Sequence, residues 1–449
     1  MARSKVEVPM LTQDYFPELA ERVRNQRLLQ PDLYGDLDFD RTPYRLTTDP
    51  DAHSALPAWV APREPILADA RTVELISTAT LLGDVVADPY AALLPSYGVP
   101  GLVGMLRQAC REGVDAVPDA PDELRALIAA MEATPAWVDR ALVEEGARHL
   151  RVGAALFSPY ITRGAFLGTF LNTYAALPMA LTGALSGRRA AVRVNETACF
   201  FAETVLPGAL DRFGVGFESA AMVRLMHSMV RYNALKRSDR WDPDVYGVPV
   251  PQVDQMPAGL INMYVLAVTA KRQGRTEFTA RERAILETCR FRCFLLGLPE
   301  ELLPTTAEGI IHVFHARGAL LRDDFDAATC GSLVRSTMDA YLRPTRSWPD
   351  RAADAVERSW SKTFFVKAFC GGDRDRAMRM GVRLSRADVV RVAVTAPYIA
   401  GRFALATAAS HRPVLSSAAD VYATRVLHRR LASWGKPAYT TDAGHYGKA

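Results

Sequence analysis

The chain has 449 residues, of which 49% are hydrophobic and 23% charged, and its formal net charge is +4. A chain of this length buries a sizeable core, and this composition excludes an intrinsically disordered protein. The small net charge gives no support to a nucleic-acid partner.

Residues 1–60 are rich in proline and aspartate, and we expect an N-terminal arm laid on a core. The first residues, MARSKVEVPMLTQDYF, contain neither an apolar signal segment nor a twin-arginine pair. The six cysteines are scattered and do not have the spacing of a disulfide framework. These features lead us to expect a cytoplasmic protein.

From about residue 63, apolar residues recur at every third and fourth position, as in VELISTATLLGDVV (73–86). This period is typical of helices that bury one face, and proline and glycine interrupt it at regular points. No segment alternates as a strand does, so the predicted fold class is all-α. We predict a main domain over 61–344 and a basic helical extension over 345–449.

The most apolar segment, residues 150–185, is interrupted by Arg163, Asn172 and two prolines. We therefore expect buried helices here and no transmembrane segment. The aromatic residues along it would line a channel for a hydrophobic molecule, or would simply belong to the core. They are Phe157, Tyr160, Phe166, Phe170 and Tyr174.

A first polar constellation lies in RVNET, within the predicted helix RRAAVRVNETACFFAETV. Arg193, Glu196 and Thr197 are spaced at i, i+3 and i+4, and so share one helix face. A guanidinium, a carboxylate and a hydroxyl together would hold dioxygen or its reduced forms, with the carboxylate moving protons. The alternative is a surface ion pair beside an incidental threonine.

A second constellation lies in VRLMHSMVR, in a predicted helix over 217–235. Arg224, His227 and Arg231 project to one side, and two flanking cations lower the pKa of an imidazole. Neutral imidazole is the form that binds metals. The layout suits a haem, with iron on His227 and propionates on the arginines, although a satisfied or surface histidine would have the same sequence.

Two further segments are distinctive. Residues 241–260, WDPDVYGVPVPQVDQMPAGL, carry four prolines within fifteen residues, and we expect an ordered loop between two helices. From Arg346 to the end, 18 Lys and Arg residues face 8 Asp and Glu residues, a net charge of +10 against −6 for the rest. This tail would meet an acidic partner or a membrane surface, or would be a solvated arginine-rich surface.

Three of these blocks, in this order and spacing, resemble a family of haem oxygenases. The family includes the latex clearing proteins (rubber oxygenases) and the oxygenase that cleaves a farnesyl side chain in mycophenolic acid biosynthesis. The blocks are Arg-x-x-x-Thr, Arg-x-x-His-x-x-Val-Arg and Trp-Asp…Gly-x-Pro…Gln-x-Asp. Here they are Arg193 and Thr197; Arg224, His227, Val230 and Arg231; and Trp241, Asp242, Gly247, Pro249, Gln252 and Asp254.

The resemblance implies a globin-like helical core with additional N- and C-terminal helices, which holds one haem b through His227. It places Arg193, Glu196 and Thr197 on the distal side of the iron. Arg224 and Arg231 would anchor the propionates or support the loop 241–254. The implied function is an oxygenase or oxidase that acts on a hydrophobic small molecule, isoprenoid-like or a secondary metabolite, with dioxygen or peroxide.

This chain also departs from the rubber oxygenases. They have a lysine immediately before the threonine, where this chain has Glu196, and an asparagine before the glutamine, where it has Pro251. Their catalytic glutamate on the preceding helix has no counterpart, since AFLGTFLNTYAALPMALTGALSG contains no acidic residue. We therefore expect Glu196 to have taken over acid–base work on the distal face.

Two other classes of function remain open from the sequence. One is a non-catalytic haem protein, a gas sensor or carrier. The other is a helical interaction protein that has lost the cofactor. The oligomeric state has no signature in the sequence.

Overall fold

The computed structural model describes residues 14–183 and 189–435, apart from the side chains of residues 257 and 258. Its described part is helical and contains no strand, which confirms the all-α prediction. The helices from the N-terminus to the middle of the chain are α1 (Pro17–Leu29), α2 (Pro31–Tyr34), α3 (Glu64–Leu67), α4 (Ala70–Ala79), α5 (Ala87–Ala92), α6 (Leu94–Glu112), α7 (Asp122–Glu132), α8 (Arg140–Leu156), α9 (Ser158–Leu167), α10 (Thr173–Leu181), α11 (Arg189–Glu203) and α12 (Val215–Arg237).

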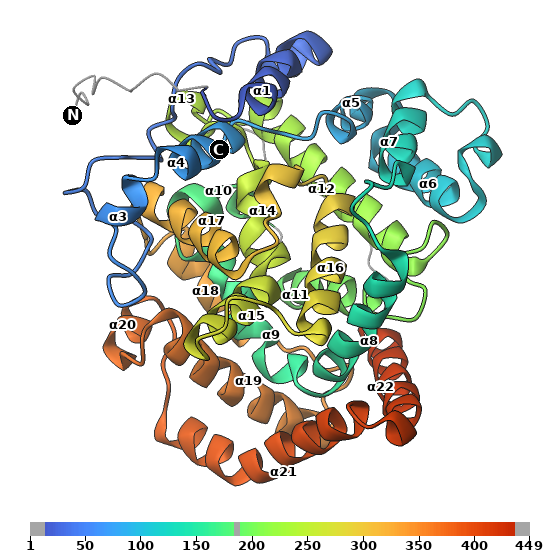
Figure 1. The fold of residues 1–449 in the computed structure, drawn as a ribbon, viewed down its shortest axis with the longest axis vertical. Coiled ribbons are helices and arrows are strands. Elements are labelled where there is room, and N and C mark those ends of the chain that lie inside the picture. Colours follow the sequence, from blue (N-terminus) through green and yellow to red (C-terminus); the bar gives the residue numbers. More distant parts are fainter. Residues whose placement is uncertain (1–13, 184–188, 436–449) are drawn as a thin grey trace.

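The second half continues in the same way. Its helices are α13 (Pro243–Tyr246), α14 (Gln252–Gly259), α15 (Ile261–Arg272), α16 (Ala280–Leu295), α17 (Ala307–Leu320), α18 (Cys330–Asp339), α19 (Trp348–Phe369), α20 (Arg374–Arg379), α21 (Arg386–Ser410) and α22 (Pro413–Trp434). Short 3₁₀ turns lie at Val114–Ala116, Gly168–Phe170 and Glu300–Leu302. In Figure 1 the N-terminal helix α1 lies at one end of the long axis and α21 at the other.

The central helix is α12, which contacts α5, α6, α11 and α16. It starts after Gly214 in an extended conformation and ends with Lys236 and Arg237 in its last turn, where cations complement the helix dipole. Most of its residues are buried, including the polar residues Arg224, Arg231 and Asn233. Polar groups on such a helix need partners inside the protein.

The predicted loop at 241–260 is partly wrong, because it contains two helices, α13 and α14. The prolines do not prevent them. Pro243 occupies the first turn of α13, and Pro251 lies just before α14, where a missing N–H leaves no helical hydrogen bond unmade. The consequence is that Gln252, Asp254 and Gln255 lie on a helix that packs against α16 and α17.

The C-terminal helices pack directly against the middle of the chain. Phe365 and Val366 of α19 share a buried cluster with Leu167 and Phe170. Ala423 and Leu427 of α22 share another cluster with residues of α8 and α11. The predicted domain boundary at 344 stays a prediction, and two buried clusters extend across it.

Candidate functional site

His227 lies midway along α12, deep in the protein, yet part of its surface stays accessible. Its neighbours Met226 and Ser228 are buried. The helix predicted over 217–235 is confirmed.

The charge state of His227 follows from its surroundings. Burial, followed by the positive charges of Arg231 and Arg193, lowers its pKa to about 4. The predicted direction is confirmed, although burial is the largest cause and one of the two cations comes from α11. At neutral pH the imidazole is uncharged, which is the form that binds iron.

A relay of buried amides fixes which ring nitrogen carries the proton. The Nε2 group of Gln252 donates to the carbonyl oxygen of Gly83 at 3.0 Å, and that oxygen can only accept. Gln252 Oε1 therefore faces Gln255, which donates to it at 2.7 Å. Gln255 Oε1 is left to accept from His227 Nδ1 at 3.0 Å. The proton is on Nδ1, and the Nε2 lone pair is available to a metal.

The two arginines that flank His227 are paired with aspartates. Arg224 Nη2 donates to Asp84 Oδ1 at 2.9 Å, and Arg231 Nε to Asp88 Oδ1 at 2.8 Å. All four side chains are buried. Burial alone would raise the pKa of Asp84, but Arg224 and then Arg231 lower it below the usual value.

Arg231 also donates to the carbonyl oxygen of Val250, in the predicted loop 241–254. This contact favours the second predicted role, support of that segment, for Arg231, whereas Arg224 is held by Asp84. Propionate anchoring by Arg224 and Arg231 stays a prediction. The sequence interpretation missed Asp84 and Asp88, although two aspartates four residues apart in an apolar run are a signal of buried ion pairs.

On α11 the predicted distal residues lie together. Arg193 Nη1 is 3.3 Å from Glu196 Oε2, and the exposed fractions of the two side chains are only 20% and 12%. The pair is therefore not the surface ion pair of the alternative interpretation. Arg193 Nε is buried without a hydrogen-bond partner among the described residues. Thr197 is half-buried on the same face, and α11 packs against α12.

The residues of the Trp-Asp…Gln-x-Asp block anchor residues 241–254 through hydrogen bonds and ion pairs. Trp241 Nε1 donates to the carbonyl oxygen of Gly247 at 2.9 Å, and Asp242 caps α13. Asp254 is buried between Arg45 and Arg317, each 2.7 Å away. Burial would raise the pKa of Asp254, but these two cations lower it. The block therefore fastens α14, which carries the glutamines of the relay.

The aromatic residues of the apolar segment mostly pack against other helices. Phe157 stacks on Phe403 of α21, and Tyr160 contacts Trp360 of α19. Phe166 packs edge-on against Phe170. These contacts favour core packing over the predicted channel lining.

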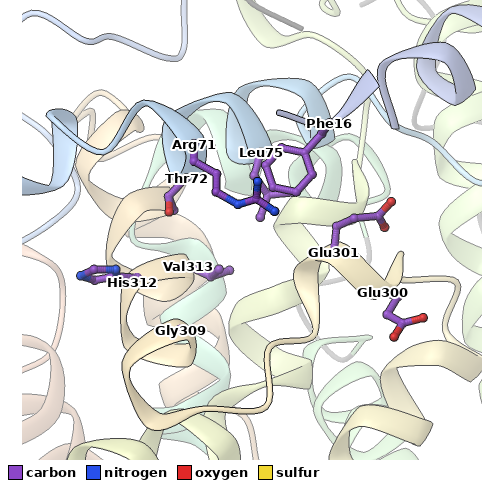
Figure 2. Close-up of a pocket in the computed structure, with 9 residues that line it drawn as sticks. All are labelled: Phe16, Arg71, Thr72, Leu75, Glu300, Glu301, Gly309, His312 and Val313. Atoms are coloured by element: carbon purple, nitrogen blue, oxygen red, sulfur yellow. The ribbon is translucent and has the colours of Figure 1, made fainter. Parts of the chain in front are cut away.

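A surface cavity of about 470 Å³ lies elsewhere, between the start of α1, α4 and α17. Figure 2 shows Arg71 at its centre beside Phe16, with Glu301 on one side and His312 on the other. None of the predicted site residues lines it. Within the described ranges, no group of three or more His, Cys, Asp or Glu side chains is placed to hold a metal ion.

Residues 151–401 match the model of the family described as ER-bound oxygenase mpaB/B'/Rubber oxygenase, catalytic domain. This match covers 251 of the 449 residues. The chain belongs to this family. The family match includes α11, α12 and the segment of α13 and α14, so the three motif blocks lie inside it.

Individual members of the family are distant relatives of this chain. A rubber oxygenase of Streptomyces sp. (strain K30) is 24% identical over 238 residues, or 49% of this chain and 54% of that protein. The alignment thus spans about half the length of the curated relative. The structure of latex clearing protein in the closed state matches 78% of this chain and 90% of its own, with a TM-score of 0.53 and 18% identity. This likeness shows a shared fold.

Proposed function

We propose that the chain is a haem b-dependent oxygenase that oxidises a hydrophobic small molecule with dioxygen, by oxygen insertion or carbon–carbon cleavage. Membership of an oxygenase family supports the reaction class. The observation that carries the cofactor assignment is the Nδ1 hydrogen bond of His227 to Gln255, which leaves the lone pair of the uncharged ring on Nε2, the atom that would bind iron.

The residues present fit a haem with one protein ligand. His227 supplies a neutral imidazole whose tautomer and orientation are held by a buried acceptor, the arrangement expected of a metal-binding histidine. Arg193 supplies a buried Nε–H without a partner among the described residues, which a bound ligand would satisfy. Bound haem would supply the redox chemistry that activates dioxygen.

The residues of α11 would act on the distal side. The Arg193 guanidinium would stabilise negative charge that develops on oxygen, and the Thr197 hydroxyl would donate a hydrogen bond to it. Glu196, held 3.3 Å from Arg193, would accept and return protons at its carboxylate. The apolar helices around the site would exclude water and favour a hydrophobic substrate.

The visible spectrum of the purified protein tests the cofactor assignment. After expression with full iron and haem supply, we expect a Soret band that is lost in His227→Ala and kept in His312→Ala, a control at an exposed histidine. Colourless protein, or a Soret band unchanged in His227→Ala, would overturn the assignment and favour a helical interaction protein.

Turnover separates the enzyme from a gas sensor or carrier. With a reductant and a panel of isoprenoid-like and other hydrophobic compounds, we expect dioxygen consumption that depends on the compound added. Stable oxygen binding without consumption across the panel would favour the non-catalytic haem protein.

A further inference from the structure

The outward face of α21 is apolar along its length. Val394 and Leu405 are each 74% exposed, and Tyr398 is 67% exposed. Val390, Val394, Tyr398 and Leu405 recur at helical spacing, so they form one stripe. At the start of α22, Val414 continues the apolar surface with an exposed fraction of 90%. A contiguous apolar surface of this kind marks an interaction site.

The opposite face of α21 fastens the helix to the body of the protein. Asp388, Ile399 and Ser410 are buried, and α21 packs against α8, α19 and α22. Asp388 accepts hydrogen bonds from Ser359 at 2.8 Å and Lys362 at 3.2 Å. Figure 1 shows α21 lying along one end of the molecule rather than projecting from it.

By length and composition, α21 is the one helix in the described ranges that could cross a membrane. To do so it would have to leave the contacts of Asp388 and Ile399, and bury an aspartate that is now paired. A helix held in this way can place its apolar stripe in the plane of a membrane surface without leaving the fold.

The charges around the stripe indicate what covers it. Residues 383–434 contain eight arginines and two aspartates, a net charge of +6. Both aspartates are already paired, Asp388 with Lys362 and Arg391, and Asp420 with the buried Arg151. Arg386 and Arg412, at the two ends of α21, are exposed. A second copy docked face to face would bring these cations together, whereas anionic headgroups would neutralise them.

We propose that α21 and the start of α22 form a docking surface for anionic lipid membranes. The helix axis lies parallel to the membrane, the stripe from Val390 to Leu405 enters the headgroup region, and the arginines bind lipid phosphates. This docking holds the protein at the membrane, where hydrophobic molecules are concentrated. The docking itself does not depend on the proposed reaction.

Vesicle flotation of the full chain tests this surface. We expect flotation with phosphatidylcholine vesicles that contain about a third phosphatidylglycerol, weak flotation with phosphatidylcholine alone, and release by high salt. The variant Val394→Glu/Leu405→Glu should lower the vesicle affinity about tenfold or more. The matched control, Leu28→Glu/Leu29→Glu, changes two exposed leucines on α1 at the other end of the molecule and should bind normally.

A second variant keeps the test valid if the glutamates disturb the fold. Arg386→Gln/Arg412→Gln changes exposed charges only, and should weaken binding to anionic vesicles without altering helix content by circular dichroism. Four results would overturn the proposal. The first three are no flotation of the parent protein, equal loss in the α1 control, and a dimer in solution that dissociates in Val394→Glu/Leu405→Glu. The fourth is retention in vesicles after alkaline carbonate, which would show a spanning helix in place of the in-plane arrangement.

Discussion

Gln255 accepts the hydrogen bond that orients the imidazole of His227, and its substitution should weaken the proposed binding of haem. In Gln255→Leu the Nδ1 proton loses its acceptor, so the ring is free to rotate and to change tautomer. We expect the haem affinity to fall about tenfold or more and the Soret maximum to shift. Haem titration measures both quantities.

Two further variants serve as controls for Gln255→Leu. Gln255→Glu keeps an acceptor oxygen and should restore most of the affinity. Gln273→Leu changes an exposed glutamine at the end of α15 and should have no effect. An unchanged spectrum and affinity in Gln255→Leu would show that the relay does not orient His227.

Glu196 carries the prediction that separates this chain from the rubber oxygenases. Glu196→Gln keeps the shape of the side chain but cannot move protons, so turnover should fall by about a hundredfold or more while the Soret band stays. Glu308→Gln, at an exposed position on α17, is the matched control. Turnover equal to that of the parent protein would remove Glu196 from the mechanism.

At this scale the sequence predicted which residues of α11 and of α12 share a helix face, because spacing on one helix can be read from a single segment, whereas the role of His227 came from the family resemblance and stays a prediction. It could not predict Gln255, Asp84 or Asp88, since their partners lie far away in the chain. Arg224 shows the difficulty well. Its position on the same side as His227 suggested a shared ligand, but its guanidinium is satisfied by Asp84, 140 positions earlier.

In the turn after α16, Gly297 is constrained both by its backbone conformation and by its neighbours. Gly297 has φ +90°, and an added Cβ would lie 2.8 Å from Asp84 Oδ2 and 2.9 Å from Arg224 Nε. We expect Gly297→Ala to lower the free energy of unfolding by about 2–4 kcal/mol, from backbone strain together with displacement of the ion pair.

Gly274→Ala separates the two contributions to that loss. Gly274 has φ +69° but open space around its Cβ position, so its substitution should cost about 1 kcal/mol from strain alone. Urea unfolding followed by circular dichroism measures both variants. Equal losses would show that the Asp84–Arg224 pair adjusts without cost.

The attachment of α21 should depend on pH through Asp388. Hydrogen bonds from Ser385 and Ser359 and the charge of Lys362 outweigh burial, and lower the pKa of Asp388 to about 2. A lowered pKa stabilises the fold above the ordinary value of 3.8, and this contribution is lost as the pH falls from there toward about 2.

Asp388→Asn should therefore lower the free energy of unfolding by about 1 kcal/mol at neutral pH, after allowance for solvent screening. The difference from the parent protein should shrink as the pH approaches about 2. Asp239→Asn, at an exposed aspartate, should show no such pH-dependent difference. Chemical denaturation across this pH range makes the comparison, and a constant difference would contradict the assignment.

The elements themselves were predictable where apolar periodicity runs over several turns, as in α8 and α12. They were not predictable at 241–260, because four prolines argue against a helix, whereas α13 and α14 are short helices that begin beside prolines, and α14 also contains Pro257. For this reason the sequence did not predict α14, the helix that carries Gln252 and Gln255.

For the whole molecule, the buried clusters shared across position 344 predict that the main domain does not fold alone. A chain that ends at residue 344 would expose Leu167, Phe170, Val152 and Leu156, which now pack near α19 or α22. We expect aggregation, measured by size-exclusion chromatography beside the full chain. A soluble, helical monomer would instead support the predicted boundary.

The overall architecture shows the limit of a single sequence. Composition and period were enough for the all-α class, because they report how each segment buries its own face. Which faces meet is decided by contacts between distant segments, such as α9 with α19 and α8 with α22. The globin-like arrangement that the resemblance implied stays a prediction for the same reason.

Gly83 ends the amide relay, and the same short segment supplies both aspartates that hold the arginines of α12. This segment precedes residues 151–401, where the family likeness is found. A domain cut out along the limits of that likeness would keep His227 with Gln252 and Gln255, but would lose Gly83, which fixes the orientation of the Gln252 amide, and the aspartates that pair with Arg224 and Arg231. A fragment that is to keep this arrangement therefore has to begin before Gly83.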